Sequence, residues 1–452
     1  MRLLALRSLL ASSALAAIAS GSVAHAQVTG KTPRRPTPTP IPQQRPPSDS
    51  QLSVDRIFSR GDFASAPVPD IHWLRDGASY LAVRPSATGA GSEIVRVDVA
   101  TGATTVLAPA SALVDENGQR IEVEDIQLSR DESKALLFHN SVRVWRTNTR
   151  GVYHVLDFAT RRLTPIAVVR TQQAGATTRA DTGQQNLLGK EASFIAPPTR
   201  SGLQMFAKFS PDGRSVAFVR DNDLFVTDLA SGRETRLTSD GSADVINGTS
   251  DWVYEEELGL KDAFRWSPDS RRIAYWRFDQ SAVPAFPIVN ETAAQYPSVG
   301  VLRYPKAGAP NSRVKVGVVD VAGGGVRAVL GRRPPRSSAG DGNDGAAPPR
   351  TSATRWLDIG GDTGLYVARM EWVGNDSLAV QRLPRKQNRL DLLVLSANTG
   401  QGRTVVTDRD SAYVDVEGEA VTWIDGGRRF LLRSDRSGWR QLYLYDRAGT
   451  LL

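Results

Sequence analysis

The sequence predicts an all-β fold built from repeated four-stranded antiparallel sheets. The clearest unit runs over residues 206–238, where four short strand-like runs are separated by tight turns. The first turn is the SPDG phrase at 210–213, in which proline fixes φ and glycine accepts a positive φ. In the run that follows, RSVAFVR, Val216 and Phe218 are expected to be buried on one face.

A similar phrase recurs about six times, and the recurrence predicts that the sheets stack around an axis. Further units open near Trp73, Leu128, Trp266, Trp372 and Trp423. A later strand in several units ends in aspartate and small residues, as in VDVATG, LDFATR, TDLASG and VDVAGG. Sheets this small bury both faces only by stacking, which a β-propeller provides. A β-sandwich of similar hairpins is the alternative, and the number of copies favours the propeller.

The composition excludes several classes of protein. The chain has 452 residues, 40% hydrophobic and 23% charged, and no cysteine, so disulfides and thiolate chemistry are excluded. The net charge of +8 includes six basic residues within 1–48, a segment without acids, so the remainder carries +2. Since nucleic-acid-binding domains concentrate basic charge on a folded face, no nucleic-acid partner is expected. No stretch has the length and composition of a transmembrane span.

The N-terminal segment is predicted to be an export signal. Arg2 and Arg7 precede an apolar, alanine-rich run at 9–23, and the AHA sequence at 24–26 fits a small-x-small cleavage site. Residues 1–26 are therefore interpreted as a cleaved signal peptide, which implies a periplasmic or secreted protein. An uncleaved anchor helix is the alternative.

The rest of the chain divides into a tether and an incomplete propeller. Residues 27–48 form a Pro-rich linker, and the propeller is predicted over 49–452. A low-complexity insert at 331–354 interrupts it and contains a formal G-x-G-x-x-G at 340–345. A dinucleotide site would need a strand before this motif and a helix after it, and neither is predicted. The last unit stops at Leu451-Leu452, where its closing strand would begin, so we expect the chain to be a fragment of a longer protein or a truncated gene product.

The most unusual stretch is DWVYEEEL at 251–258, between two units, where connecting loops reach the mouth of a propeller channel. A solvated charged face is the simple explanation for three successive carboxylates. Aromatic and aliphatic neighbours make that explanation weaker, because carboxylates held together in a partly enclosed place attract a cation such as an amine. The residues concerned are Glu255, Glu256 and Glu257, with Trp252 and Tyr254 beside them.

Arg146 is a second candidate. It lies in VWRTN, after a strand expected to end at His139, and it follows an aromatic residue. It could cover apolar surface at the rim, or it could present its fork of donors to a carbonyl or carboxylate. The residues alone leave both interpretations open.

Several segments resemble the dipeptidyl peptidase IV family of serine peptidases, specifically its N-terminal propeller domain. The resemblance covers roughly residues 50–452 and rests on two specific segments and several weaker ones. These are DWVYEEE (251–257), RWSPDSRRIAYWRFD (265–279), the Val283-Pro284 step, RYPKAGAPN (303–311) before VKV (314–316), VWR (144–146) and RLDLL (389–393).

The resemblance implies an eight-bladed propeller, of which about six blades are represented, capping an α/β-hydrolase domain missing from this chain. It implies that Glu256 and Glu257 bind the α-ammonium of a peptide substrate, supported by Glu255, Trp252 and Tyr254. Arg146 would hold the carbonyl of the first peptide bond and orient the glutamates. The full-length enzyme would release Xaa-Pro or Xaa-Ala dipeptides from free N-termini by serine hydrolase chemistry, and it would form homodimers, as the family commonly does.

The catalytic part of that family is not found in these residues. The sequence contains no G-x-S-x-G, the motif that carries the nucleophile. Outside the leader the histidines are His72, His139 and His154, each in or beside a strand-like run, so each is expected to be structural. There is no H-E-x-x-H, and no metal or cofactor is expected. Two alternatives remain: a non-enzymatic secreted propeller that binds peptides or envelope proteins, and a tripeptidyl or acylaminoacyl peptidase.

Overall fold

The structure is a computed structural model. It describes residues 52–65, 70–87, 89, 91–167, 202–292, 295–321, 353–361, 363–416, 418 and 420–452. The signal peptide predicted at 1–26 and the linker predicted at 27–48 lie outside the described residues. So does the insert predicted at 331–354, apart from its last two positions.

The chain divides into two compact units, Met1–Pro67 and Val68–Leu452. The first contains α1 (Val54–Phe58), which begins where the Ser53 hydroxyl accepts a hydrogen bond from the amide of Arg56 at 3.2 Å. Every described strand belongs to the second unit.

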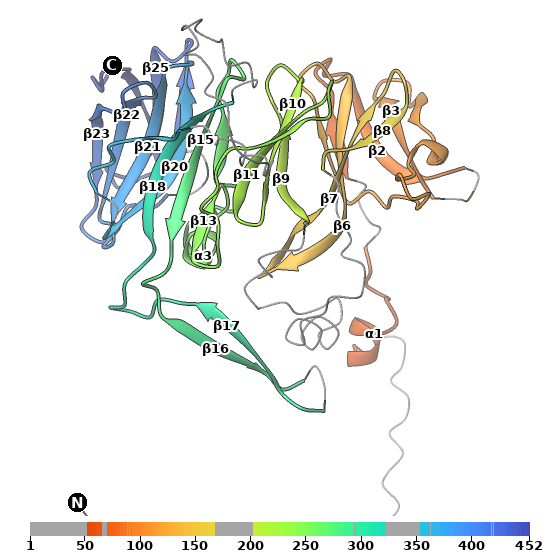
Figure 1. The fold of residues 1–452 in the computed structure, drawn as a ribbon, viewed down its shortest axis with the longest axis horizontal. Helices are drawn as coiled ribbons and strands as arrows, with labels where there is room; N and C mark the ends of the chain where they lie inside the picture. Colours follow the sequence, from red (N-terminus) through yellow and green to blue (C-terminus); the bar gives the residue numbers. More distant parts are fainter. Residues whose placement is uncertain are drawn as a thin grey trace, which may run out of the picture. The chain divides into compact units, whose positions relative to one another are not determined.

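The second unit contains six consecutive antiparallel sheets of three to five strands, coloured from orange to blue in Figure 1, of which the second and third are joined edge to edge into one eight-stranded sheet. The first sheet is β1 (Ile71–Trp73), β2 (Ser79–Pro85), β3 (Ser92–Asp98) and β4 (Thr104–Ala108), followed by the short helix η1 (Ala110–Ala112). The second is β5 (Asp125–Leu128), β6 (Lys134–Val144), β7 (Thr147–Asp157) and β8 (Arg162–Pro165). The third is β9 (Gln204–Phe209), β10 (Ser215–Arg220), β11 (Asp223–Asp228) and β12 (Glu234–Arg236).

The last three sheets complete the series. The fourth is β13 (Val245–Asn247), β14 (Phe264–Trp266), β15 (Arg272–Asp279), β18 (Arg313–Asp320) and β19 (Arg355–Trp356). The fifth is β20 (Leu365–Val373), β21 (Ser377–Pro384), β22 (Arg389–Ser396) and β23 (Gly402–Arg409). The sixth is β24 (Val421–Ile424), β25 (Arg429–Ser434) and β26 (Gln441–Asp446), and a separate two-stranded hairpin is β16 (Ala285–Asn290) with β17 (Ser298–Arg303).

Stacking between neighbouring sheets forms the core. Five clusters of buried apolar side chains lie between consecutive sheets, one for each interface in the series. The period-2 alternation of a strand sends one set of side chains to each neighbour. Val216 and Phe218, which are 0% exposed, join the cluster shared with the second sheet, whereas Ala217 and Val219 join the cluster shared with the fourth. The predicted burial of Val216 and Phe218 is therefore confirmed, and both faces of their strand are covered.

The recurring turn phrases have a physical basis in the structure. In three of the recurring turns the serine hydroxyl donates to the aspartate two residues later, which closes the turn between two consecutive strands of a sheet. The pairs are Ser129 to Asp131 at 2.7 Å, Ser210 to Asp212 at 2.6 Å and Ser267 to Asp269 at 2.6 Å. Repetition of turn, strand pattern and stacking confirms the all-β, propeller-like architecture.

Candidate functional site

The acidic run forms a helix, α3 (Trp252–Leu258), where the sequence analysis expected a connecting loop. Asp251 caps its start by accepting a hydrogen bond from the amide of Tyr254 at 2.9 Å, and Gly259, at φ 62, ends it in the left-handed conformation. Burial raises the pKa of Asp251, although the Ser312 hydroxyl donates to its carboxylate at 2.5 Å. The helix is thus fixed at both ends by local chemistry.

The two aromatic residues of the run hold α3 to the fold. Tyr254 is 1% exposed, and its hydroxyl accepts a hydrogen bond from the amide of Val367 in β20 at 2.9 Å. Its ring packs edge-on against Phe278, with centroids 4.6 Å apart. Trp252 is partly exposed and packs against Tyr304, with centroids 4.5 Å apart. Both aromatic residues thus anchor the helix.

The three glutamates have different surroundings. Glu255 is half-buried, and its Oε1 is buried with no hydrogen-bond partner among the described residues. Desolvation raises the pKa of Glu255, with the neighbouring charge of Glu256 adding to the effect. Glu257 is exposed, and within the described part of the chain its carboxylate forms no hydrogen bond or ion pair. Of the three, Glu256 alone forms an ion pair within the described residues, although the charges of Lys261 and Arg146 also act on Glu255.

The ion-pair partner of Glu256 is Arg146, which lies 110 residues away in the sequence. Its Nε donates to Oε2 of Glu256 at 2.6 Å and its Nη2 donates to Oε1 at 2.7 Å, a bidentate fork. The arginine side chain is 68% exposed, and that of Glu256 is 28% exposed. The hydrogen bonds and charge of Glu256 raise the pKa of Arg146. The structure therefore brings together two of the predicted site residues that are distant in sequence.

A long hairpin carries Arg146 to this position. Figure 1 shows β6 and β7 extending beyond their sheet toward the side on which α3 lies. The strand predicted to end at His139 continues to Val144, because the pairing shifts register after His139 and then resumes. That boundary prediction was wrong: a β-bulge let the strand continue where a turn was expected. Arg146 lies in the turn next to Trp145, whose φ is 50°.

The arrangement presents carboxylates beside a fixed guanidinium. Each oxygen of Glu256 accepts one bond from Arg146 and keeps a second lone pair. Glu257 adds a carboxylate with both oxygens free of protein partners within the described residues. A primary ammonium has three donors and needs such acceptors, so the site has the chemistry to bind a cationic amine beside a hydrogen-bond donor.

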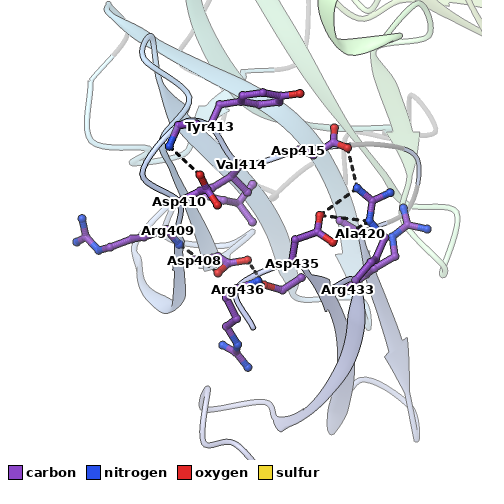
Figure 2. A pocket seen from close by; sticks show the side chains of 14 residues that line it. Asp408, Arg409, Asp410, Tyr413, Val414, Asp415, Ala420, Arg433, Asp435 and Arg436 are labelled. Atoms are coloured by element: carbon purple, nitrogen blue, oxygen red, sulfur yellow. Dashed lines mark hydrogen bonds and ion pairs between the residues drawn. The ribbon is translucent and has the colours of Figure 1, made fainter. Parts of the chain in front are cut away.

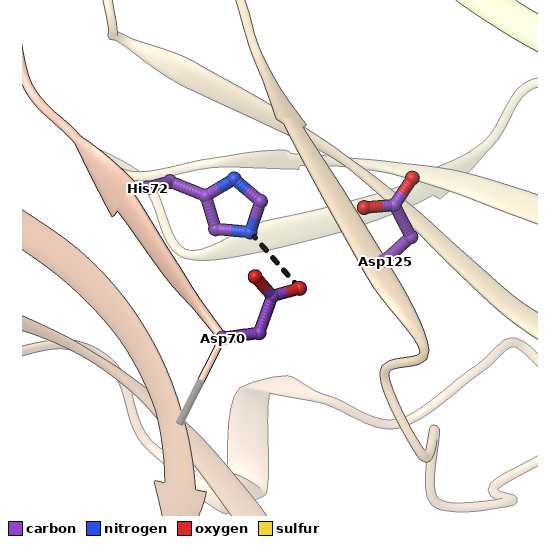
Figure 3. Close-up of side chains that lie close together, drawn as sticks. All are labelled: Asp70, His72 and Asp125. Atoms are coloured by element: carbon purple, nitrogen blue, oxygen red, sulfur yellow. Dashed lines mark ion pairs between the residues drawn. The ribbon is translucent and has the colours of Figure 1, made fainter. Parts of the chain in front are cut away.

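Three further potential ligands lie close together where the first and second sheets meet (Figure 3). The ligand atoms of Asp70, His72 and Asp125 all lie within 4.8 Å of one another, and His72 Nε2 is 3.8 Å from Asp70. No local pattern marks this group, because Asp70 directly precedes β1, His72 lies in β1 and Asp125 begins β5. Both aspartates are exposed, and nothing else in the described residues indicates an ion there.

A pocket of about 310 Å³ lies between β23 and the sixth sheet (Figure 2). Its walls contain several aspartates that are already paired. Arg440 bonds Asp415 at 2.7 Å and Asp435 at 3.0 Å, and the Ser434 hydroxyl donates to Asp408 at 2.5 Å. Because these acids are satisfied within the wall, we assign the pocket no ligand.

Comparison with known proteins establishes the family. A sequence-family model described as the dipeptidyl peptidase IV (DPP IV) N-terminal region matches residues 129–451. The chain belongs to the dipeptidyl peptidase IV family. The resemblance inferred from the sequence is thereby confirmed. Among the described residues, no helix has the length and apolar character needed to cross a bilayer.

Relatives of this dipeptidyl peptidase IV family chain are longer than it is. The probable dipeptidyl peptidase 4 of Aspergillus fumigatus is 30% identical over 271 residues, 56% of this chain and 31% of that protein. Dipeptidyl peptidase 4 of Trichophyton rubrum is 28% identical over 258 residues, 54% of this chain and 30% of that protein. The crystal structure of Porphyromonas gingivalis dipeptidyl peptidase 4 superposes with a TM-score of 0.68 at 25% identity, covering 89% of this chain and 49% of that one. The matches thus span about a third of the fungal proteins and about half of the bacterial one.

Proposed function

We propose that this chain is the substrate-selecting part of an exported dipeptidyl peptidase. In this proposal the complete protein releases Xaa-Pro or Xaa-Ala dipeptides, and an α/β-hydrolase domain outside this chain supplies the nucleophile. The observation that carries the proposal is the bidentate pair between Arg146 and Glu256, with Glu257 open beside it. Family membership and the dipeptidyl peptidase names of the relatives support the same function.

The proposed roles follow from charge and reach. The α-ammonium of a peptide binds between Glu256 and Glu257, which accept its three protons in charge-assisted hydrogen bonds. Arg146 fixes the Glu256 carboxylate and directs its remaining donors at the carbonyl of the first peptide bond. Because the ammonium is held at a fixed place, the distance to the nucleophile sets how many residues are removed. An acylaminoacyl enzyme acts on a blocked N-terminus, which offers no ammonium to the two carboxylates. A tripeptidyl enzyme would bind the same ammonium one residue farther from the nucleophile.

Localisation and partners belong to the same proposal. The signal peptide interpreted at 1–26 would export the protein to the periplasm or the medium. The partners are peptides with a free N-terminus, the hydrolase domain and, in a homodimer, a second copy of the protein.

Dipeptide release by the full-length protein tests the proposal. Gly-Pro-p-nitroanilide and its N-acetyl derivative differ only at the ammonium, so the free form should be cleaved and the acetylated form should not. Glu256→Gln and Glu257→Gln should each lower kcat/KM roughly 30-fold or more, which corresponds to about 2 kcal/mol of lost transition-state stabilisation. The reason is that the ammonium loses a charged acceptor as it is desolvated. Arg146→Ala should weaken binding of the same substrate.

Three results would contradict the proposal. Equal cleavage of both substrates would show that the enzyme does not recognise the ammonium. Wild-type kinetics in both glutamine variants would show that Glu256 and Glu257 do not bind the substrate. Binding of free peptides without any hydrolysis would favour the non-enzymatic secreted propeller instead.

A further inference from the structure

A chain of polar side chains lies at the root of the hairpin that carries Arg146. Nε2 of His154 is 3.0 Å from Oε2 of Glu116, and Nδ1 of His154 is 2.9 Å from Nε2 of His139. Both imidazoles are 2% exposed, whereas the side chain of Glu116 is 52% exposed. Glu116 lies on the connection between the first and second sheets, and the histidines lie on β7 and β6.

One pattern of protons satisfies this chain. His154 donates from Nε2 to Glu116, so its Nδ1 is an acceptor, and His139 donates to it from Nε2. Nδ1 of His139 is then a bare acceptor, and this atom is buried with no hydrogen-bond partner among the described residues. A further proton on either ring would place two N–H groups against each other or leave a buried N–H unpaired, which is costly. Protonation of His139 at Nδ1 would keep its Nε2–H bond to His154 but would bury an unpaired N–H, so the arrangement favours neutral His139.

This chain of hydrogen-bonded side chains ends at His139, where the regular pairing of β6 with β7 stops. His139 is the last residue of β6 in regular register with β7 before the bulge, and the next residue, Asn140, has φ 50°. Beyond the bulge the two strands extend as an arm, residues 140–150, with Arg146 in its turn. A bulge bends and twists the strand, so interactions at this point help to set the direction of the arm. The tip is held as well, because Val144 and Trp145 pack on the apolar cluster between the third and fourth sheets.

A second acid from the same connection holds the other side of the bulge. Oε1 of Glu124 accepts a hydrogen bond from the amide of Ser141 at 2.9 Å, and the Ser141 hydroxyl donates to Oε2. Asn148 on the returning strand donates to the same hydroxyl at 2.9 Å. The root of the arm is thus held on both sides of the bulge: Glu116 acts on His139 through His154, and Glu124 binds Ser141. We call these contacts the clamp.

We propose that Glu116, His154 and His139 are positioning residues that fix the arm so that Arg146 meets Glu256. The proposal rests on the proposed function, since it assigns the clamp a role in binding the substrate N-terminus. None of the three residues touches the substrate. Because Val144 and Trp145 keep the tip packed on the cluster between the third and fourth sheets, breaking the hydrogen-bonded chain should leave the fold and this contact in place. It should loosen the root of the arm, so that the Arg146 fork meets Glu256 for less of the time.

The clamp also makes the arm sensitive to acid. Burial, and then the charge of His154, lower the pKa of His139 from 6.5 to about 4, while Asp115 and Glu124 oppose the shift and Asn140 favours the charged form. Since the folded state holds His139 neutral, its contribution is complete above about pH 6.5 and is lost as the pH falls toward 4. We expect KM to rise over that range as the arm loosens.

The kinetic test uses the full-length protein with Gly-Pro-p-nitroanilide from pH 5 to 8. Glu116→Ala should raise KM roughly 3- to 10-fold at pH 7.5 with little change in kcat, the effect of one lost hydrogen bond on a binding group. Glu116→Gln keeps an acceptor for His154 and should restore KM to within about twofold of wild type. Glu122→Ala is the matched control, because Glu122 is an exposed acid of the same connection. His139→Gln keeps a donor and does not titrate, so the rise of KM in acid should flatten.

Amide hydrogen exchange supplies a readout that does not need catalysis. In Glu116→Ala the amides of residues 140–149 should exchange faster, while those of the neighbouring sheets stay as in wild type, and Glu116→Gln and Glu122→Ala should match wild type. The positioning role is overturned if Glu116→Ala equals Glu122→Ala in both KM and exchange while Glu256 is needed for activity. If the full-length protein releases no dipeptide, the proposed function fails and exchange alone decides whether the clamp orders the arm.

Discussion

Replacing Tyr254 by phenylalanine would test how α3 is held. The hydroxyl of this residue accepts the amide proton of Val367 at 2.9 Å, and both residues are buried, at 1% and 0% exposure. The variant removes one oxygen and keeps the ring against Phe278, so no cavity larger than a hydroxyl forms. The Val367 amide is left without an acceptor in the interior.

The expected cost follows from that single orphaned donor. A buried N–H that loses its partner costs about 1–3 kcal/mol. Removing the hydroxyl also ends the cost of keeping that polar group away from water, which offsets part of the loss. We therefore expect the free energy of unfolding to fall by about 1–2 kcal/mol, the lower end of that range.

Urea unfolding measures this loss as a lower midpoint at unchanged slope. Tyr366→Phe is the matched control from the same cluster: its hydroxyl accepts from the Asn311 amide at 2.7 Å, and Asn311 is only partly buried and can turn to water. That variant should cost clearly less. If the midpoints of the two variants coincide, the hydrogen bond to Val367 does not stabilise the fold and the explanation is refuted.

Two further predictions concern other parts of the fold. Gly151→Ala should destabilise by about 1–3 kcal/mol, because the added Cβ would lie 2.5 Å from the ring of Phe138, and unchanged thermal unfolding would contradict this. The hydroxyls of Ser129 and Ser133 lower the pKa of Asp131 to about 2, so its charged form stabilises the fold above about pH 3.8 and this contribution is lost as the pH falls toward 2. Asp131→Asn should therefore lower Tm at pH 7 and reduce its fall below pH 4; an unchanged pH dependence of Tm would show that this turn contributes nothing.

The repeated elements could be predicted from the sequence because their determinants are local. The SPDG turn at 210–213 and the alternation of Val216 and Phe218 depend on neighbours a few residues away, and the stacking follows from burying two faces of each sheet. The resemblance of the 251–257 run then pointed to the family.

The geometry of the site depended on information that no local pattern carries. The pairing of Arg146 with Glu256 requires a strand that continues through a bulge at His139, and nothing in the residues there marks the extra length. The helix at 252–258 did leave a signal: Asp251 is a good N-cap and Gly259 a good C-terminal stop, but three adjacent carboxylates masked the pattern. The histidine pair was expected to be structural, yet its connection to Glu116 spans two sheets and appears only once the chain is folded.

The second and third sheets differ from the other neighbours in one respect. Strands β7 and β9 pair directly, at Arg150 with Met205 and Gly151 with Gln204, so these two sheets form one eight-stranded ladder. Elsewhere in the described series no strand of one sheet pairs with a strand of the next, and only single main-chain hydrogen bonds cross, such as the one from the Asn247 amide to the Asn222 carbonyl at 3.0 Å. Gene rearrangements that duplicate or delete a repeat would therefore be tolerated at those other junctions more readily than here. A recombination breakpoint between these two repeats would cut main-chain hydrogen bonds and displace the arm as well, so we expect the pair to be inherited as a single block.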